Sequence, residues 1–132
     1  MKYMLDTNIC IYIIANRSIE VVQKFRQVRN GYISLSVVVA SELAYGVAKS
    51  QWKEKNRITL DSFLNGVVIQ AMPESVVWHY AELRCHLERT GQIIGENDQW
   101  IAAHALATDS VLVTNNTREF ARVPGLKLEN WL

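Results

Sequence analysis

Met4-Leu5-Asp6-Thr7-Asn8 is the stretch from which the expected fold is built. The run Lys2-Tyr3-Met4-Leu5 that leads into Asp6 is too short for a helix and suits a buried strand. In α/β folds, ligands bind beyond the carboxyl ends of parallel strands, which is where Asp6 would lie. Asp and Thr are also favoured helix N-caps, so Asp6 or Thr7 could simply start the helix expected from Asn8.

Short strands and helices alternate along the rest of the chain. The expected strands are residues 2–5, 32–35, 67–69, 111–113 and 126–128, and the expected helices are 8–15, 19–30, 37–49, 51–64, 74–90, 97–107 and 115–120. Ser36 is expected to cap one helix and Gly91 to end another. The alternation favours an α/β fold: one domain over residues 1–132, with a mainly parallel sheet of four to five strands flanked by helices as an α/β/α sandwich.

Apolar spacing predicts the inward face of one surface helix. Its inward residues are expected to be Val22, Phe25 and Val28, in the helix that ends at Asn30-Gly31. The helix from Gln51 is more polar, and its apolar members are Trp52, Ile58 and Phe63.

Composition limits the class of protein. The chain has 132 residues, 49% hydrophobic and 20% charged, with a net charge of +1, so we expect a globular domain without an overall basic surface. Nucleic-acid binding would therefore need a local patch. Cys10 and Cys85 fall in apolar helical patterns and are expected to be buried free thiols. No apolar run approaches the roughly 20 residues of a membrane span, and Asp6 interrupts any signal-like start, so a cytoplasmic protein is expected.

The acid Glu42 lies on an apolar stripe of its expected helix, with Val38, Val39, Tyr45 and Gly46. A carboxylate on such a stripe needs a cationic partner, or it lies at the stripe's edge and reaches solvent. A helix-interior glycine costs about 1 kcal/mol relative to alanine, so Gly46 predicts close approach by another element.

Two further groups of polar residues occupy comparable positions. Asp98 lies in the first turn of a helix, where the helix dipole alone could explain an acid, and nearby Glu96 is expected to be a solvated loop residue. Thr114-Asn115-Asn116 follows the all-apolar strand at residues 111–113, with Glu119 one turn further on. Turn and cap chemistry could also explain the asparagines, and Glu119 could be a solvated surface acid.

Taken together, Asp6, Glu42, Asp98 and the turn at 114–116 could converge on one edge of the sheet. Carboxylates brought around one point repel each other unless a divalent cation neutralises them. Oxygen ligands favour Mg²⁺ or Mn²⁺ over zinc.

Four blocks of the sequence resemble the PIN-domain family, and more closely its VapC toxins from bacterial type II toxin–antitoxin pairs. The blocks are Met4-Leu5-Asp6-Thr7-Asn8, Ser41-Glu42-Leu43-Ala44-Tyr45-Gly46, Asp98-Gln99-Trp100-Ile101-Ala102-Ala103-His104-Ala105 and Val113-Thr114-Asn115-Asn116-Thr117-Arg118-Glu119-Phe120. The segment from Pro124 to Trp131 also agrees, so the resemblance covers essentially the whole chain.

The resemblance implies an endoribonuclease that depends on Mg²⁺, with Mn²⁺ as the alternative. Asp6, Glu42 and Asp98 match the family's acidic positions, with Asp6 and Asp98 as metal ligands and Glu42 also near the metal, orienting or deprotonating the attacking water. Attack by water would leave 5′-phosphate and 3′-hydroxyl ends. Many members carry a fourth acid where this chain has Asn116, so the fourth position falls to Asn116 or to Glu119.

The resemblance also implies the substrate and the partners. The substrate would be RNA, with the anticodon stem-loop of initiator tRNA as the best candidate. Arg118 and Arg122 are expected to contact phosphates, and Asn8 and Thr114 to contact the substrate as well. The basic run made of Lys49, Trp52, Lys53, Lys55 and Arg57 could grip RNA or be a solvated helix face. A VapB-type antitoxin would occupy a groove near the acids, and the apolar helices up to Gly66 would supply that groove and a homodimer surface.

Other interpretations remain open at this point. A PIN module that only binds RNA or protein is the main alternative, favoured by the missing fourth acid. An aspartyl-phosphate phosphatase would need a second aspartate two residues after Asp6, where this chain has Asn8. His79, His86 and His104 lack metal-ligand spacing, so they are expected to be packed or surface residues.

Overall fold

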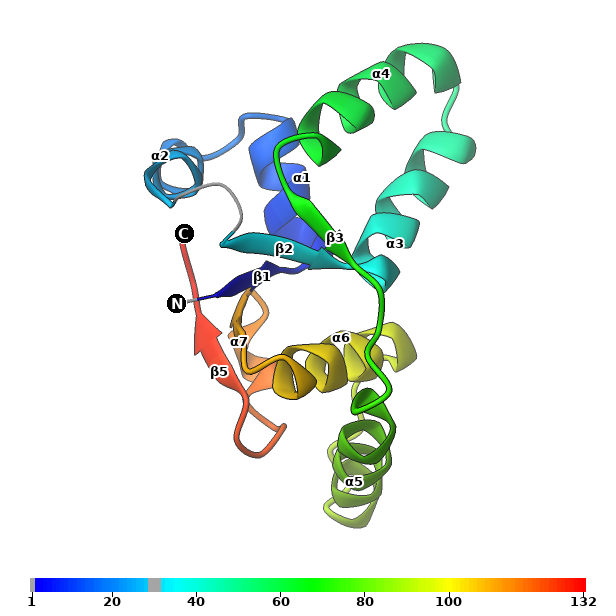
Figure 1. The fold of residues 1–132 in the computed structure, drawn as a ribbon, viewed down its shortest axis with the longest axis vertical. Coiled ribbons are helices and arrows are strands. Elements are labelled where there is room, and N and C mark those ends of the chain that lie inside the picture. Colours follow the sequence, from blue (N-terminus) through cyan, green and yellow to red (C-terminus); the bar gives the residue numbers. More distant parts are fainter. Residues whose placement is uncertain (1, 29–31) are drawn as a thin grey trace.

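The protein is built around one five-stranded sheet (Figure 1). The structure, a computed structural model, describes residues 2–28 and 32–132. The strands are Tyr3–Leu5 (β1), Ile33–Ser36 (β2), Val68–Gln70 (β3), Val111–Val113 (β4) and Lys127–Glu129 (β5). Their order is β3-β2-β1-β4-β5, and each neighbouring pair is parallel. The expected α/β fold with a parallel sheet is confirmed.

Helices cover both faces of this sheet. Helices α1 (Thr7–Ile14), α2 (Ile19–Gln27), α3 (Val37–Ala48) and α4 (Lys53–Leu64) lie on one side, and α5 (Val76–Arg89) and α6 (Glu96–Ala107) lie on the other (Figure 1). The short helix α7 (Thr117–Phe120) contacts β5. Burial on both faces agrees with the apolar composition of the central strands, in which Met4, Leu5, Leu35, Leu112 and Val113 are fully buried.

The pair β1 and β4 marks the point where the chain reverses its direction across the sheet. The connection that leaves β1 leads towards β2 and β3, whereas the one that leaves β4 leads the other way, to β5. Leu5 pairs with Val113, so Asp6 and Thr114 leave the sheet side by side at its carboxyl edge. Open α/β sheets form their ligand-binding crevice at such a switch point.

Side-chain caps fix the start of two helices at this edge. Asp6 caps α1 by accepting the Ile9 N–H, and Ser36 caps α3 by accepting the Val38 N–H. The prediction for Ser36 is therefore confirmed, and Asp6 is a cap as well as a strand-end acid.

The inward face of α2 differs from the prediction. In α2 the fully buried residue is Val21, not Val22, because the face that packs inward runs Val21, Phe25, Val28 at helical spacing. The prediction that this helix ends at Asn30-Gly31 lies outside the described residues, and α2 itself ends at Gln27.

In α4, two of the three apolar residues noted in the sequence are exposed: Trp52 at 66% and Ile58 at 72%. The helix begins one residue after Trp52, and its inward face is Leu60, Phe63 and Leu64. Phe63 packs against Phe25 of α2, with ring centroids 5.9 Å apart.

Three smaller expectations were tested by the structure. Cys10 is buried, but Cys85 is exposed, because α5 turns Val76, Leu83 and Leu87 to the core instead. Both cysteines are free thiols. Glu96 is exposed as expected, but it is the first residue of α6, not part of a loop. Among the described helices, none combines the length and the apolar character needed to cross a membrane.

Candidate active site

Asp6 is the most enclosed acid at the carboxyl edge of the sheet, with 6% of its surface exposed. Its Oδ1 accepts the Ile9 N–H at 2.9 Å, and its Oδ2 accepts the Thr114 hydroxyl at 2.5 Å. Burial raises the pKa of Asp6, and the negative charge of Glu42 adds to the rise, although the two hydrogen bonds oppose it. The carboxylate is therefore held rigidly where its charge is costly.

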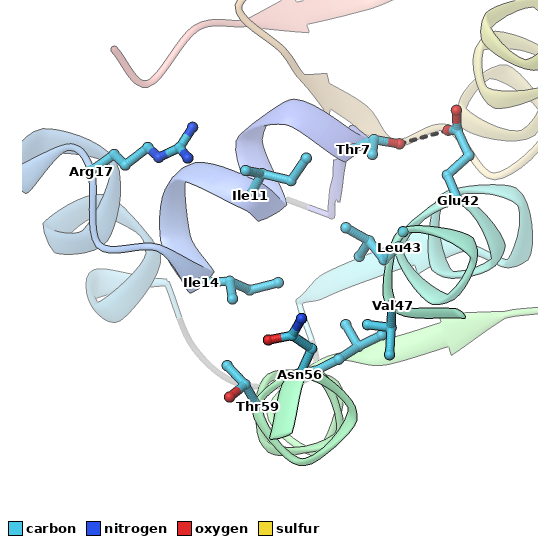
Figure 2. Close-up of a pocket in the computed structure, with 11 residues that line it drawn as sticks. Thr7, Ile11, Ile14, Arg17, Glu42, Leu43, Val47, Asn56 and Thr59 are labelled. Carbon is cyan, nitrogen blue, oxygen red and sulfur yellow. Dashed lines mark hydrogen bonds between the residues drawn. The ribbon is translucent and has the colours of Figure 1, made fainter. Parts of the chain in front are cut away.

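Glu42 comes from α3, which contacts α1 across this edge. Its Oε1 accepts the Thr7 hydroxyl at 2.6 Å (Figure 2). The Glu42 side chain is half-buried. Its partner is this neutral hydroxyl group and not a cation, which was one of the two expectations. The ion pairs of the described residues lie elsewhere: Arg57–Asp61, Arg84–Glu88 and Lys127–Asp109.

Asp98 shows that these acids lie within electrostatic reach of one another. Its pKa is raised to about 6, first by burial and then by the negative charges of Glu42, Glu119 and Asp6. These four acids come from α1, α3, α6 and α7 and the strand ends before them. The arrangement concentrates negative charge and is suited to binding a cation.

Asn116 and Glu119 act together. Asn116 Nδ2 donates to Glu119 Oε2 at 3.0 Å, and the Asn116 N–H donates to Thr114 Oγ1 at 2.9 Å. Glu119 is thus the residue at this turn that adds charge near Asp98, and Asn116 orients it.

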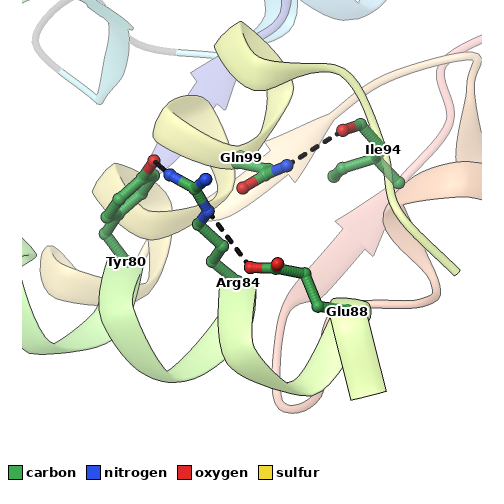
Figure 3. A network of polar contacts seen from close by, with 5 residues as sticks. All are labelled: Tyr80, Arg84, Glu88, Ile94 and Gln99. Carbon is green, nitrogen blue, oxygen red and sulfur yellow. Dashed lines mark hydrogen bonds and ion pairs between the residues drawn. The ribbon is translucent and has the colours of Figure 1, made fainter. Parts of the chain in front are cut away.

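The helix that carries Asp98 is fixed by neutral contacts. Gln99 Nε2 donates to the Ile94 carbonyl at 3.0 Å, which ties the preceding loop to α6 (Figure 3). Trp100 stacks on Tyr80 of α5, with ring centroids 3.6 Å apart and planes 2° apart. These contacts hold the first turn of α6 in place.

The four residues expected to contact the substrate differ in how far they are exposed to solvent. Arg118 and Asn8 are exposed, whereas Arg122 is half-buried and donates to the Ile93 carbonyl at 3.2 Å. Thr114 is fully buried with its hydroxyl bonded to Asp6, so it positions that carboxylate. The basic run at the start of α4 is exposed at Lys53, Lys55 and Arg57.

Two positioning residues were not expected from the sequence. Thr7 holds Glu42, and its place beside Asp6 in the opening stretch was the only available signal. His104 is fully buried with Nδ1 2.8 Å from Ser36 Oγ, which links α6 to the start of α3. The two residues are 68 positions apart, so no local pattern could indicate the pair.

The residue types at this site suit a divalent metal ion, but their side chains are not arranged as a complete set of metal ligands. Within the described ranges, no three His, Cys, Asp or Glu side chains are grouped closely enough to hold one ion. The site offers carboxylate oxygens, and burial together with neighbouring negative charge raises the pKa of Asp6 and of Asp98, which fits a hard cation such as Mg²⁺ or Mn²⁺.

Two cavities open beside Glu42. One, of about 550 Å³, lies among α1, α3 and α4 and includes Ile11, Ile14 and Val47 (Figure 2). The other, of about 750 Å³, extends along α3 past Tyr45 and Lys49 to Asn97 of α6. Gly46 lines both. A Cβ at Gly46 would meet nothing within 4 Å, so the prediction of a close approach there is wrong: the glycine faces open space.

Comparisons with known proteins agree with this architecture. The PIN domain family profile matches residues 3–126. The chain is 46% identical over 132 residues to Ribonuclease VapC2 of Rickettsia felis, covering 99% of this chain and 98% of the relative. It is 40% identical over 131 residues to the tRNA(fMet)-specific endonuclease VapC of Shigella flexneri, with coverage of 99% and 98%. The crystal structure of VapBC2 from Rickettsia felis bound to a promoter DNA fragment superposes with a TM-score of 0.95 at 44% identity, covering 100% of both chains.

Proposed function

The chain belongs to the PIN-domain family, within its VapC group, and on that premise we propose that it is a divalent-metal-dependent endoribonuclease that acts as the toxin of a toxin–antitoxin pair. The observation that carries the proposal is the gathering of four acids distant in sequence at one edge of the sheet, where Asp98 lies within electrostatic reach of Glu42, Glu119 and Asp6. Perturbed carboxyl groups gathered at the switch point of an α/β sheet are typical of a hydrolytic site.

In this proposal, each acid has its own role. Asp6 and Asp98 hold the cation, and Glu42, oriented by Thr7, accepts a proton from the attacking water. A bound divalent cation supplies positive charge that lowers the pKa of that water and stabilises charge on the scissile phosphate. Glu119, held by Asn116, takes the place of the fourth family acid. Attack by water leaves 5′-phosphate and 3′-hydroxyl ends.

The substrate and partner follow from the relatives. The Shigella flexneri relative is named as specific for tRNA(fMet), which supports initiator tRNA as the substrate of this chain. The Rickettsia felis structure is a VapBC2 complex, which supports a VapB-type antitoxin as partner. We place the antitoxin in the cavity lined by Ile11, Ile14 and Val47, beside the acids. A homodimer is proposed on the exposed apolar residues Val68, Ile69, Val77 and Trp78.

The decisive experiment compares the parent protein with Asp6→Asn and Asp98→Asn. Parent protein is expected to cleave tRNA with Mg²⁺ or Mn²⁺ and to stop when EDTA is added, whereas both variants fold but do not cleave. Sequencing 5′ ends after brief expression, with Asp98→Asn as control, identifies the target and the bond. Full cleavage by a folded Asp6→Asn protein would remove the assignment, and parent protein that binds RNA without cleaving it would favour a non-catalytic PIN module.

A further inference from the structure

The cavity of about 750 Å³ along α3 has features that the packing of the chain does not explain. It starts at Thr7 and Glu42, follows α3 past Tyr45, Gly46 and Lys49, and is bounded by Asn97 of α6. Its volume lies in the range of ordinary small-ligand sites, roughly 300–1,000 Å³.

Gly46 is the first such feature. It lies inside α3, where glycine destabilises a helix by about 1 kcal/mol relative to alanine. Its φ is not positive, and a Cβ there would meet nothing within 4 Å. Neither backbone conformation nor internal packing therefore requires a glycine here. The missing side chain leaves room for something outside the chain.

Tyr45 and Lys49 are the second feature. Tyr45 is 65% exposed although it is a large aromatic residue, and Lys49 Nζ lies 4.9 Å from the centre of its ring. Lys49 follows Glu42 by two helical turns, about 10 Å along the axis at 1.5 Å per residue. Glu42 and Lys49 are the charged residues that line this cavity. The cavity therefore has an acid at the proposed metal site and an aromatic ring with a cation further along.

This layout matches an RNA strand. Proteins recognise unpaired RNA by stacking bases on aromatic side chains and by cations that follow the phosphates. We propose that the cavity holds the unpaired strand of the RNA next to the scissile phosphodiester: a base stacks on Tyr45, Lys49 contacts a neighbouring phosphate, and Gly46 leaves space for the ribose between them. The inference rests on the proposed endoribonuclease function and names the substrate contacts of that site.

The first test measures Tyr45 and Lys49 in the full chain on a short unpaired RNA oligonucleotide. Tyr45→Ala is expected to raise KM, and the Kd measured in the Asp98→Asn background, by about tenfold or more, since stacking on an aromatic ring contributes roughly 1–3 kcal/mol per base. Lys49→Gln raises both and makes binding less sensitive to salt. Tyr45→Phe, which keeps the ring, loses less than Tyr45→Ala. Tyr32→Ala serves as the matched control, because Tyr32 is also exposed but precedes β2 at the opposite edge of the sheet.

In the second test, Gly46→Ala is expected to stabilise the fold and, at the same time, to weaken the binding of RNA. The added methyl group raises the melting temperature, because alanine favours the helix and the Cβ clashes with nothing. The same methyl group takes up the space proposed for the ribose and raises the KM and Kd for RNA several-fold. A residue with a purely structural role would not gain stability while losing affinity.

Two outcomes overturn the inference while leaving the proposed function intact. In the first, parent protein cleaves RNA with Mg²⁺, but the Tyr45, Gly46 and Lys49 variants keep the parent KM and Kd. In the second, Gly46→Ala weakens binding of the co-expressed antitoxin and leaves RNA affinity unchanged, which would make the cavity a protein-binding groove. A parent protein that does not cleave RNA would contradict the proposed function itself. The Kd values of the variants for RNA would still decide the inference.

Discussion

The carboxyl group of Asp98 gives the site a pH dependence that can be measured without a substrate. Its pKa is raised from 3.8 to about 6, so the folded protein binds this proton more tightly than the unfolded chain does. The resulting stability is fully present below about pH 4 and is lost as the pH rises through 6.

Asp98→Asn is therefore expected to stabilise the protein at about pH 7.5 in EDTA, by about 1–3 kcal/mol at 1.4 kcal/mol per pKa unit. The gain shrinks at about pH 4.5, where the parent carboxyl is already protonated. Urea unfolding at the two pH values measures the difference. Asp61→Asn, a change at an exposed acid on α4, is the control and should show no such pH-dependent gain. Equal gains at both pH values would show that the stabilisation does not come from the raised pKa of Asp98.

Thr114 shows how one hydroxyl group holds a buried charge. Thr114→Val removes the donor to Asp6 Oδ2, so the variant should unfold more easily by about 1–3 kcal/mol and lose RNA cleavage. Thr114→Ser keeps the hydroxyl and should retain most of both properties. Denaturant midpoints and cleavage rates of the two variants test this, and a Val variant as stable as the Ser variant would show that the hydrogen bond matters little.

At the scale of elements, Ser36 joins three structures: it ends β2, caps α3 and contacts His104 of α6. Burial lowers the pKa of His104, so the neutral ring contributes stability that is present above about pH 6.5 and is lost as the pH falls. This trend is opposite in sign to that of Asp98.

Ser36→Ala should therefore cost more than the loss of a cap alone. A lost N-cap costs about 1 kcal/mol, and leaving the buried imidazole without its partner adds roughly 1–3 kcal/mol. Ser18→Ala removes the cap of α2 and a hydrogen bond to the exposed Glu20, but leaves no buried group without its partner, so this matched control should cost about the first amount. Denaturant unfolding of both proteins compares the costs, and equal losses would mean that the His104 contact contributes nothing.

The elements themselves were largely predictable, because glycine, proline and helical spacing mark them locally. The strand at residues 111–113 and the end of α5 near Gly91, which has a φ of 66°, agree with the sequence. The inward face of α2 did not agree, since Val21 is selected by the packing of α2 against the rest of the fold, α1 included. No local pattern carries that information.

For the whole molecule, the proposed metal site predicts that Mg²⁺ and Mn²⁺ stabilise the fold. An ion that binds only the folded chain raises the melting temperature as its concentration exceeds Kd. The shift should disappear in Asp98→Asn and persist in Glu96→Gln, whose parent acid is exposed two residues away. Thermal unfolding with and without the cation tests this. The same shift in Asp98→Asn would contradict a site built on Asp98.

The meeting of the acids was predictable only in part. A strand end marked Asp6, an apolar helix stripe marked Glu42 and a helix start marked Asp98, and parallel strands imply a common edge. That β1 lies next to β4 was not visible, because strand order is decided by the packing of the intervening helices. This neighbourhood is what brings Thr114 onto Asp6, and it also carries Glu119 of α7 to within electrostatic reach of Asp98.

The place of β4 in the sheet has a consequence for synthesis on the ribosome. β1 is made long before the strand that must lie beside it, at residues 111–113. Until then Asp6 has no Thr114 to hold it, and neither Glu119 nor a seated α6 can face Glu42. A chain that stops before these residues thus lacks the assembled acids, so a cell that makes this protein meets its chemistry only after residues 111–119 have been made.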